Sequence, residues 1–409
     1  MADYYDRYER RAPRSREAAL LRDLRGILSV SKARAATLRM QLKNIEVDQI
    51  KTRADLAQIP VLRKADLVAR QKEMPPFGGA CGTRPGALQH LLMSRDVTFQ
   101  PEGQAKDWWN SARALFAAGI RKGDIILNCF SYHFTPDGHM IDSGLRALGC
   151  PVIPAGDHDL EAAQIAIDHY GPVAYCGPSD YLKTLLDMCI ERGRPVTTVK
   201  RAFLGCCLTS SAVPADFAAY DIACYAGYMT GDLGIVAYES DARDGLIVNE
   251  GLIVEIVKPG TDDPLPAGQI GEIVVTRLCA DYPLLRFGTG HLSWIIAGPS
   301  PCGRTNMRIR GSLGRVGESV TVADHVIAPA QIAEIAARHA DVRRLRLLIS
   351  GAAQPILQGE SADDGAALQA KLAEEFFAVT KLRAAVEILP VGCLPADGLL
   401  ICDQRPKQS

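Results

Sequence analysis

Residues 124–156 read DIILNCFSYHFTPDGHMIDSGLRALGCPVIPAG, and this stretch is the clearest indication of the fold class. The apolar runs at its two ends, DIILNCF and CPVIPAG, have the length of buried strands. Between them, GHMIDSGLRALG places apolar residues at helical spacing and ends on a glycine, which is a common helix terminator. A strand, a helix and a second strand in this order predict two parallel strands joined by a crossover helix.

The same alternation continues on both sides of this stretch. Residues 108–120, 161–171 and 181–193 have helical periodicity, whereas 172–177, 199–205 and 221–227 are short apolar runs. Upstream, residues 16–42 carry apolar residues at helical spacing and predict one amphipathic helix leading into the body. The chain up to about residue 232 is therefore predicted to be an α/β domain with a mainly parallel sheet whose faces are covered.

After residue 232 the pattern changes twice. Short apolar runs at 234–240, 252–260 and 271–278, separated by Gly and Pro turns, predict a β-rich layer. Beyond a break near residue 310, helices at 329–340 and 367–379 alternate with strands, which is typical of a compact α+β unit. We predict a large N-terminal domain, 1–308, built from parallel α/β sheets and the β-rich layer, and a small C-terminal α+β domain, 309–409.

Composition narrows the function classes. The 409 residues include 46 Lys and Arg against 47 Asp and Glu, a net charge of -1, which argues against nucleic acid as a partner. The sequence has neither an apolar run long enough to cross a bilayer nor the apolar core of a signal peptide, so we predict a soluble, cytoplasmic protein without a membrane partner. The 12 cysteines form no CxxC pair and are interpreted as reduced core residues.

Several segments, taken in order, resemble the adenylate-forming superfamily, and above all its phenylacetate-CoA ligase family. The resemblance runs from about residue 3 to residue 406 and rests on the combination of segments, since none is decisive alone. The segments are DLAQIPVLRKADL, GLRALGCPVIPAG, VKRAFLG, GLIVNEGLIVEIV, PAGQIGEIVVTRL, YPLLRFGTGHLS, PSPCGRTNMRIRGSLGR and LPADG.

This resemblance implies an enzyme that uses ATP and Mg²⁺ to convert a carboxylic acid into an acyl-adenylate and then passes the acyl group to CoA. It also implies that the small C-terminal domain is mobile and swings between the two half-reactions. The expected partners are a small-molecule acid or its CoA thioester, and a homodimer is left open.

The resemblance also implies the residues of the nucleotide site. Thr230 and Asp232, in Tyr-Met-Thr-Gly-Asp, match a catalytic pattern that ends in a metal-facing acid, so Asp232 is the candidate Mg²⁺ ligand. The predicted cofactor-binding residues are Gly205, Tyr228, Thr230, Arg286, His291 and Arg315.

Three departures from the family pattern concern the nucleotide. The expected phosphate loop lies between Met93 and Trp108 and contains a single glycine. His291 stands where relatives place an Asp for the ribose hydroxyls, and one imidazole acceptor does not replace a bidentate carboxylate. Leu399 follows LPADG where relatives have a catalytic Lys, and leucine cannot neutralise an oxyanion.

The acyl pocket keeps more of the pattern. Phe130, Tyr132 and Phe134 occupy the positions at which the family has aromatic residues beside the acid, although an aromatic core cluster is a nearly equal alternative. Of the Cys and His zinc ligands found in some relatives only Cys302 remains, and His133, Asp137 and His139 match no standard zinc spacing, so no zinc is predicted.

Two function classes remain after this comparison. One is an active ATP-dependent aryl or acyl acid-CoA ligase with an unusual nucleotide site. The other, which the combined losses favour, is a ligase-like protein that binds an aryl or acyl acid or a CoA thioester while ATP-dependent adenylation is impaired or lost.

Overall fold

The computed structural model describes residues 4–205, 215–322, 325–350, 354–362 and 365–405. Their contacts define an N-terminal unit, Met1–Thr289 with Ser293–Ser312, and a C-terminal unit, Gly290–Leu292 with Leu313–Ser409. The sequence places the division after residue 308, whereas the contacts keep residues 309–312 with the N-terminal unit and assign Gly290–Leu292 to the other. Among the described residues, no helix is both long and apolar enough to cross a membrane.

A nine-stranded sheet organises the N-terminal unit, with strand order β14-β15-β10-β9-β8-β7-β6-β4-β5. The neighbours from β5 through β4, β6 and β7 to β8 run parallel, and the remaining neighbours run antiparallel. The parallel half confirms the predicted α/β fold. The strands are β4 (Ile126–Asn128), β5 (Val152–Pro154), β6 (Ala174–Gly177), β7 (Arg201–Gly205), β8 (Ala223–Thr230), β9 (Gly234–Tyr238), β10 (Leu246–Val248), β14 (Ile295–Ile296) and β15 (Arg308–Ile309).

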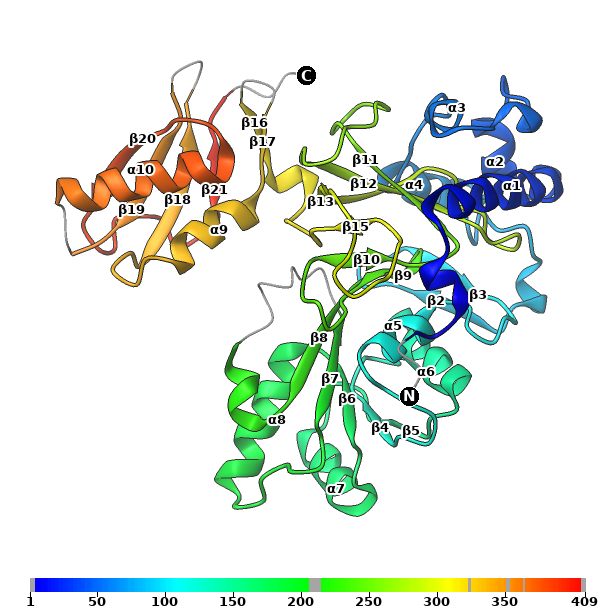
Figure 1. Ribbon diagram of the computed structural model, residues 1–409, viewed down its shortest axis with the longest axis horizontal. Helices are drawn as coiled ribbons and strands as arrows, with labels where there is room; N and C mark the ends of the chain where they lie inside the picture. The colour runs from blue at the N-terminus through cyan, green and yellow to red at the C-terminus, as the bar shows by residue number, and fades with distance from the viewer. Residues whose placement is uncertain (1–3, 206–214, 323–324, 351–353, 363–364, 406–409) are drawn as a thin grey trace. The chain divides into compact units, whose positions relative to one another are not determined.

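Helices cover both faces of the parallel half (Figure 1). Successive strand residues point to opposite faces, so Ile126 and Cys176 join the cluster containing α5 and α6, whereas Leu127 and Tyr175 join the cluster containing α7 and α8. This double burial explains why the strands read as continuous apolar runs. The helices are α5 (Ser111–Ala117), α6 (Pro136–Leu148), α7 (Leu160–Tyr170) and α8 (Ser179–Glu191), and a 3₁₀ turn, η5 (Ala215–Tyr220), precedes β8.

The predicted β-rich layer is a second sheet of order β1-β13-β12-β11, in which β11 and β12 are buried along their whole lengths. The N-terminal helices pack on it: Leu24 and Leu28 share a cluster with Ile253 of β11. The single helix predicted over 16–42 is instead divided into α1 and α2. The elements are β1 (Leu62–Arg63), β11 (Leu252–Val257), β12 (Gly271–Arg277), β13 (Phe287–Ser293), α1 (Pro13–Ser31), α2 (Ala36–Gln41), α3 (Arg53–Ala57) and α4 (Lys64–Glu73), with 3₁₀ turns η1 (Arg7–Arg10), η2 (Val47–Gln49) and η3 (Pro85–Ala87).

A separate antiparallel hairpin, β2 (His90–Met93) and β3 (Phe99–Glu102), has at its tip residues 94–98, the first part of the phosphate loop predicted between Met93 and Trp108. Its register pairs Met93 with Phe99 beside the tip and His90 with Glu102 at the open end. The hairpin therefore places the side chains of residues 94–98 at one end and those of His90 and Glu102 at the other.

The C-terminal unit has an α+β architecture. Helices α9 and α10 contribute Ile332, Leu372 and Phe376 to one apolar cluster with Leu347 and Leu357 of a four-stranded sheet of order β20-β19-β18-β21. This confirms the predicted fold class of the C-terminal region. Its elements are η6 (Val316–Glu318), β16 (Val320–Val322), β17 (His325–Ile327), α9 (Pro329–Ala337), β18 (Arg344–Ile349), β19 (Ile356–Glu360), α10 (Ala366–Thr380), β20 (Ala385–Leu389) and β21 (Ile401–Asp403).

Candidate functional site

A pocket of about 650 Å³ opens at the carboxyl ends of the parallel strands. Ligands of open α/β sheets bind at this edge, where loops from neighbouring strands converge. Phe130 and Ser131 follow β4, Pro178 follows β6, and Gly205 ends β7. The other lining residues are Arg95, Asp137, Asp157, Ser179, Asp180, Tyr181, Thr184 and Met229.

The inner wall of this pocket is apolar and tightly packed. A Cβ on Gly205 would lie 2.2 Å from the sulfur of Met229 and 2.6 Å from the Phe130 ring, so only glycine fits there without rearrangement. Gly205 and Phe130, predicted separately as cofactor-binding and substrate-binding residues, therefore meet in one pocket.

The mouth of the pocket carries charge. Arg95 lies 3.3 Å from Asp157, an ion pair across two lining segments. Asp137, in the first turn of α6, is largely enclosed, and burial raises its pKa while Arg95 opposes the shift. Three aspartates and one arginine line the pocket, so its charged groups carry a negative excess.

The structure does not gather the three predicted aromatic residues in the pocket. The hydroxyl of Tyr132 accepts a hydrogen bond from Asn128 at 2.7 Å, and its ring lies edge-on to His139, outside the pocket lining. Phe134 is 61% exposed, has φ of 62° and contacts His133. Only Phe130 lines the pocket, because backbone geometry after β4 turns the other two side chains elsewhere.

Asp232, the candidate metal ligand, is 2% exposed and already faces a cation of the protein. Lys64 Nζ lies 3.9 Å from its carboxylate and 2.5 Å from that of Asp96, and Gln100 donates a hydrogen bond to Asp232 at 3.2 Å. Burial raises the pKa of Asp232, while Lys64 opposes the shift. Sequence reasoning missed Lys64 and Gln100, which come from α4 and β3.

The two residues predicted beside Asp232 are placed as follows. Tyr228 is fully buried in β8. The Thr230 hydroxyl, at the end of β8, accepts a hydrogen bond from the backbone N–H of Leu233 at 3.2 Å. That bond fixes the turn that carries Asp232, so Thr230 helps to position the Asp232 carboxylate.

The hairpin tip at the predicted phosphate loop is closed by its own side chains. The hydroxyls of Ser94 and Thr98 donate to Asp96 at 2.6 and 2.7 Å, and the backbone N–H of Ser94 donates to the Thr98 carbonyl. Burial works to raise the pKa of Asp96, but hydrogen bonds from Lys64, Ser94 and Thr98 prevail and hold it well below its usual value. The tip therefore presents an ionised carboxylate.

Arg286, predicted to bind the cofactor, is 0% exposed. Its Nε donates to Glu255 at 3.0 Å, and its two terminal nitrogens donate to the carbonyls of Ala57, Ile59 and Asp262. These contacts commit the guanidinium to joining α3, β11 and β13. All three guanidinium nitrogens therefore have partners within the protein, which gives Arg286 a structural role, and its contact with a cofactor stays a prediction.

The remaining nucleotide residues lie in the C-terminal unit. His291 and Arg315 pair in an antiparallel backbone bridge, so the structure brings these two predicted cofactor-binding residues together. Leu399 is 54% exposed and its backbone N–H donates to Asp397, which is also paired with Arg346. Leu399, at the predicted position of the catalytic Lys, is thus an exposed apolar side chain.

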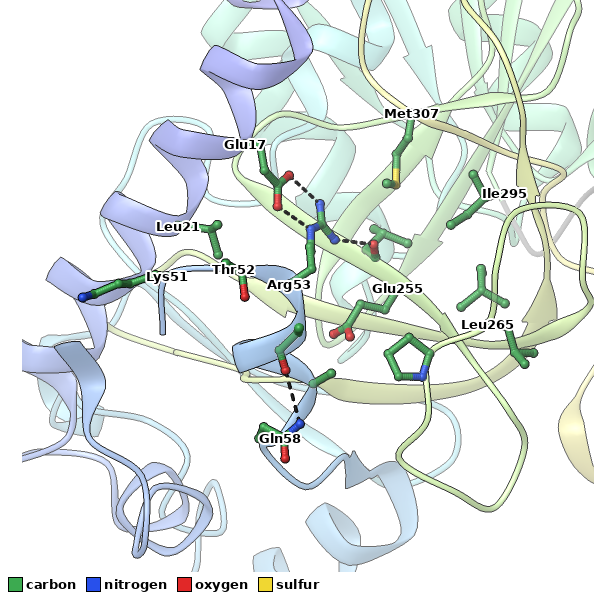
Figure 2. A pocket seen from close by; sticks show the side chains of 15 residues that line it. Glu17, Leu21, Lys51, Thr52, Arg53, Gln58, Glu255, Leu265, Ile295 and Met307 are labelled. Carbon is green, nitrogen blue, oxygen red and sulfur yellow. Dashed lines mark hydrogen bonds and ion pairs between the residues drawn. The ribbon is translucent and has the colours of Figure 1, made fainter. Parts of the chain in front are cut away.

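A second, larger pocket of about 760 Å³ lies among α1, α3 and the β-rich sheet (Figure 2). Arg53 pairs with Glu17 at 2.6 Å and donates to the Val254 carbonyl at 2.8 Å, while Leu21, Leu265 and Met307 supply apolar walls. No sequence signal pointed to it, because its walls come from distant segments without a common motif. It lacks the convergence of strand ends seen at the first pocket, which we therefore take as the functional site.

Comparison with known proteins supports the resemblance seen in the sequence. No family model matches the chain. The phenylacetate-coenzyme A ligase of Thermus thermophilus is 28% identical over 68% of this chain and 65% of its own length, and that of Aromatoleum evansii is 26% identical over 72% and 68%. The chain thus spans about two thirds of the length of these relatives.

Solved structures establish the fold. The crystal structure of an open conformation of 2-hydroxyisobutyryl-CoA ligase, in complex with 2-HIB-AMP and CoA, superposes with a TM-score of 0.87 over 98% of this chain and 95% of the ligase at 21% identity. The anthranilate-CoA ligase AuaEII in complex with anthranoyl-AMP gives 0.51 over 75% of this chain and 64% of that chain at 12% identity. The chain is thus similar in sequence to phenylacetate-coenzyme A ligases and has the fold of solved acid-CoA ligase structures.

Proposed function

We propose that this protein binds an aryl or acyl group, as the free acid or its CoA thioester, in the pocket at the strand ends, and that its ATP-dependent adenylation is impaired. The observation that carries the proposal is the hairpin tip. There Asp96, held ionised, stands in the phosphate loop, and Lys64 bridges it to Asp232.

Electrostatics at this tip opposes triphosphate binding. A phosphate cradle relies on backbone N–H groups and cations that converge on the anion. Here a carboxylate occupies the turn, and two unit charges of like sign about 4 Å apart repel by roughly 4 kcal/mol at an effective dielectric of 20. Lys64, the nearby cation, is already paired with Asp96 and Asp232.

The same tip argues against a tightly bound Mg²⁺ at Asp232. Magnesium is held by one or two carboxylates together with substrate phosphates and several waters. The Asp232 carboxylate is buried against Lys64 and Gln100, so a metal ion would have to displace the ammonium from its partner. The ribose and catalytic positions, His291 and Leu399, add two further losses of the groups that the family uses.

The strand-end pocket retains what acyl recognition needs. Phe130 and Met229 form an apolar wall beside Gly205, and Ser131, Ser179 and Thr184 place hydroxyls around the opening. A cavity of this size holds an aryl or short acyl group. The negative excess of the lining favours the neutral thioester group over a free carboxylate at that point, whereas the anionic phosphates of CoA have to lie outside the pocket.

An active acid-CoA ligase is the second candidate. It is favoured by one observation: the similarity to 2-hydroxyisobutyryl-CoA ligase covers 98% of the chain and so includes both units that such a reaction uses. In that case the protein would use ATP and CoA, as the resemblance to the family implies, despite the acidic residue at the hairpin tip.

A thermal-shift experiment with phenylacetyl-CoA and phenylacetate tests the pocket. The thioester is expected to raise the Tm of the full-length protein in proportion to the logarithm of its concentration, and more than the free acid does. Thr184→Trp, which places an indole at the exposed edge of the pocket, should abolish the shift. Ile190→Trp, on the same helix but outside the lining, should retain it.

Two results would contradict this assignment. One is the absence of stabilisation by either compound at millimolar concentration. The other is a shift of equal size in wild type and Thr184→Trp, which would place the ligand elsewhere.

A further inference from the structure

The open end of the β2–β3 hairpin brings together three side chains that can bind metals. His90 and Glu102 are directly opposed in the hairpin register, so their side chains lie on the same face. His139, from the first turns of α6, completes the group, and one potential ligand atom from each residue lies within 4.8 Å of the other two. Two of the three therefore come from strands and one from a helix, which are rigid supports for a metal site.

The geometry within the cluster is close to that of a bound state. His90 Nδ1 lies 2.7 Å from a carboxylate oxygen of Glu102, and the rings of His90 and His139 have centroids 4.6 Å apart. Ligand atoms each about 2.0–2.2 Å from one zinc ion are separated by roughly 3.4 Å in a tetrahedral site. Side-chain rotations that close a separation of 4.8 Å by about 1.4 Å and open the 2.7 Å pair by about 0.7 Å satisfy that requirement.

The burial of the three side chains is graded from one side to the other. Glu102 is 2% exposed, His139 is half-buried, and the His90 side chain is 39% exposed. A buried carboxylate needs a positive partner, and within the described part of the chain Glu102 forms an ion pair with His90. A cation at this position would compensate the carboxylate, and the exposed His90 side gives it a path from solvent.

The surroundings of His139 also fit a ligand. Its imidazole makes a hydrogen bond with the backbone of Tyr132 and stacks edge-on against the Tyr132 ring at 5.3 Å. Tyr132 is itself held by the 2.7 Å hydrogen bond from Asn128. Metal-binding histidines characteristically use the second ring nitrogen in this way, because the hydrogen bond fixes the tautomer and the ring orientation.

We propose that His90, Glu102 and His139 bind a divalent transition-metal ion of the zinc class. Two imidazoles and one carboxylate are the donor set for such an ion, whereas Mg²⁺ and Ca²⁺ prefer oxygen ligands throughout. Three protein ligands leave a fourth position, which a water molecule fills on the exposed side of His90. The ion joins the open end of the hairpin to the start of α6.

This site uses a different set of residues from the one on which the prediction of no zinc was based. That prediction concerned Cys302 and the run containing His133, Asp137 and His139. The structure separates this run: His133 lies against Phe134 and Asp137 lines the strand-end pocket. His139 alone joins the hairpin residues, and no spacing motif links positions that meet through strand register.

Metal titration of the full-length protein tests the proposal. After treatment with a chelator and its removal, the wild type is titrated with ZnCl₂ by calorimetry, and in parallel with CoCl₂ followed by visible absorption. One equivalent is expected to bind, with the visible bands of four-coordinate Co²⁺ and a rise in Tm. His139→Ala is expected to weaken this binding by at least about 100-fold.

Two further variants separate the site from folding and from adventitious binding. His133→Ala removes an exposed histidine six positions away on the same segment and should leave the binding unchanged. Glu102→Gln keeps the size of the side chain and should also lose the bound equivalent, which covers the case in which His139→Ala fails to fold. Absence of stoichiometric binding in the wild type, or equal binding by folded His139→Ala and His133→Ala, would overturn the site.

Discussion

Replacing Arg286 by alanine is expected to lower the free energy of unfolding by about 3–5 kcal/mol, because breaking a buried pair leaves an uncompensated carboxylate. Glu255 loses its partner in this variant, and the carbonyls of Ala57, Ile59 and Asp262 lose a donor. Burial already raises the pKa of Glu255 while Arg286 opposes the shift, so the variant is expected to raise this pKa further.

Denaturant unfolding followed by tryptophan fluorescence measures this effect, since Trp108 and Trp109 are both buried in the N-terminal unit. Arg22→Ala is the control: Arg22 is an exposed arginine paired with its neighbour Asp23, and its removal should change stability by less than about 0.5 kcal/mol. Equal unfolding midpoints for the two variants would show that the buried contacts of Arg286 do not stabilise the N-terminal unit.

If His291 and Leu399 stand at the proposed ribose and catalytic positions, changing both is expected to raise the rate of adenylation. His291→Asp supplies a carboxylate for the ribose hydroxyls, and Leu399→Lys supplies a cation for the reacting acid. One such electrostatic group is worth about 10²–10³ in rate, so the double variant should increase phenylacetate-dependent ATP–pyrophosphate exchange at least about 100-fold over wild type.

The control for the expected gain in exchange rate is a variant in which the lysine is introduced at a position other than 399. Val391→Lys combined with His291→Asp adds a lysine at another exposed apolar position of the C-terminal unit and should show no comparable gain. Adding Asp96→Asn to the double variant should raise exchange further, because the triphosphate then meets no carboxylate at the hairpin tip. A folded triple variant without exchange above wild type would mean that these residues are not what limits adenylation.

The sequence was sufficient for the fold because each strand and helix carries a local signal. The buried runs DIILNCF and PVAYCG are apolar on both faces, as expected for strands of a covered parallel sheet. The order of helices and strands along the chain also differs between the N-terminal and C-terminal units. The predicted helix over 16–42 was wrong in one respect: the structure divides it after Ser31, and no proline or glycine at 32–35 signals that break.

The site was only partly predictable, because motifs give positions along the chain and not side-chain directions. Gly205 and Phe130 meet in the pocket, but Tyr132 faces His139 and Phe134 faces solvent at positive φ. Arg286 sits in a segment typical of the family, yet its side chain turns into the interior.

Other features depend on contacts between distant segments. Lys64, Asp96 and Asp232 come from α4, the hairpin tip and the turn after β8, so their network is invisible in any local pattern. Asp96, an acidic residue within the predicted phosphate loop, was the one local sign of this network. The shortage of glycines in the loop was used for the prediction instead. The His90, Glu102 and His139 cluster similarly requires the register of the hairpin.

Calorimetric titration of the wild-type protein with ATP and Mg²⁺, beside a titration with phenylacetyl-CoA under the same conditions, measures whether the nucleotide site is impaired while the acyl pocket still binds its ligand. We expect the thioester to bind, and ATP–Mg²⁺ to show no affinity tighter than about 1 mM, equivalent to about −4 kcal/mol. Micromolar binding of ATP–Mg²⁺ would contradict the account, because the ionised Asp96 and its pairing with Lys64 would then be no obstacle to the nucleotide.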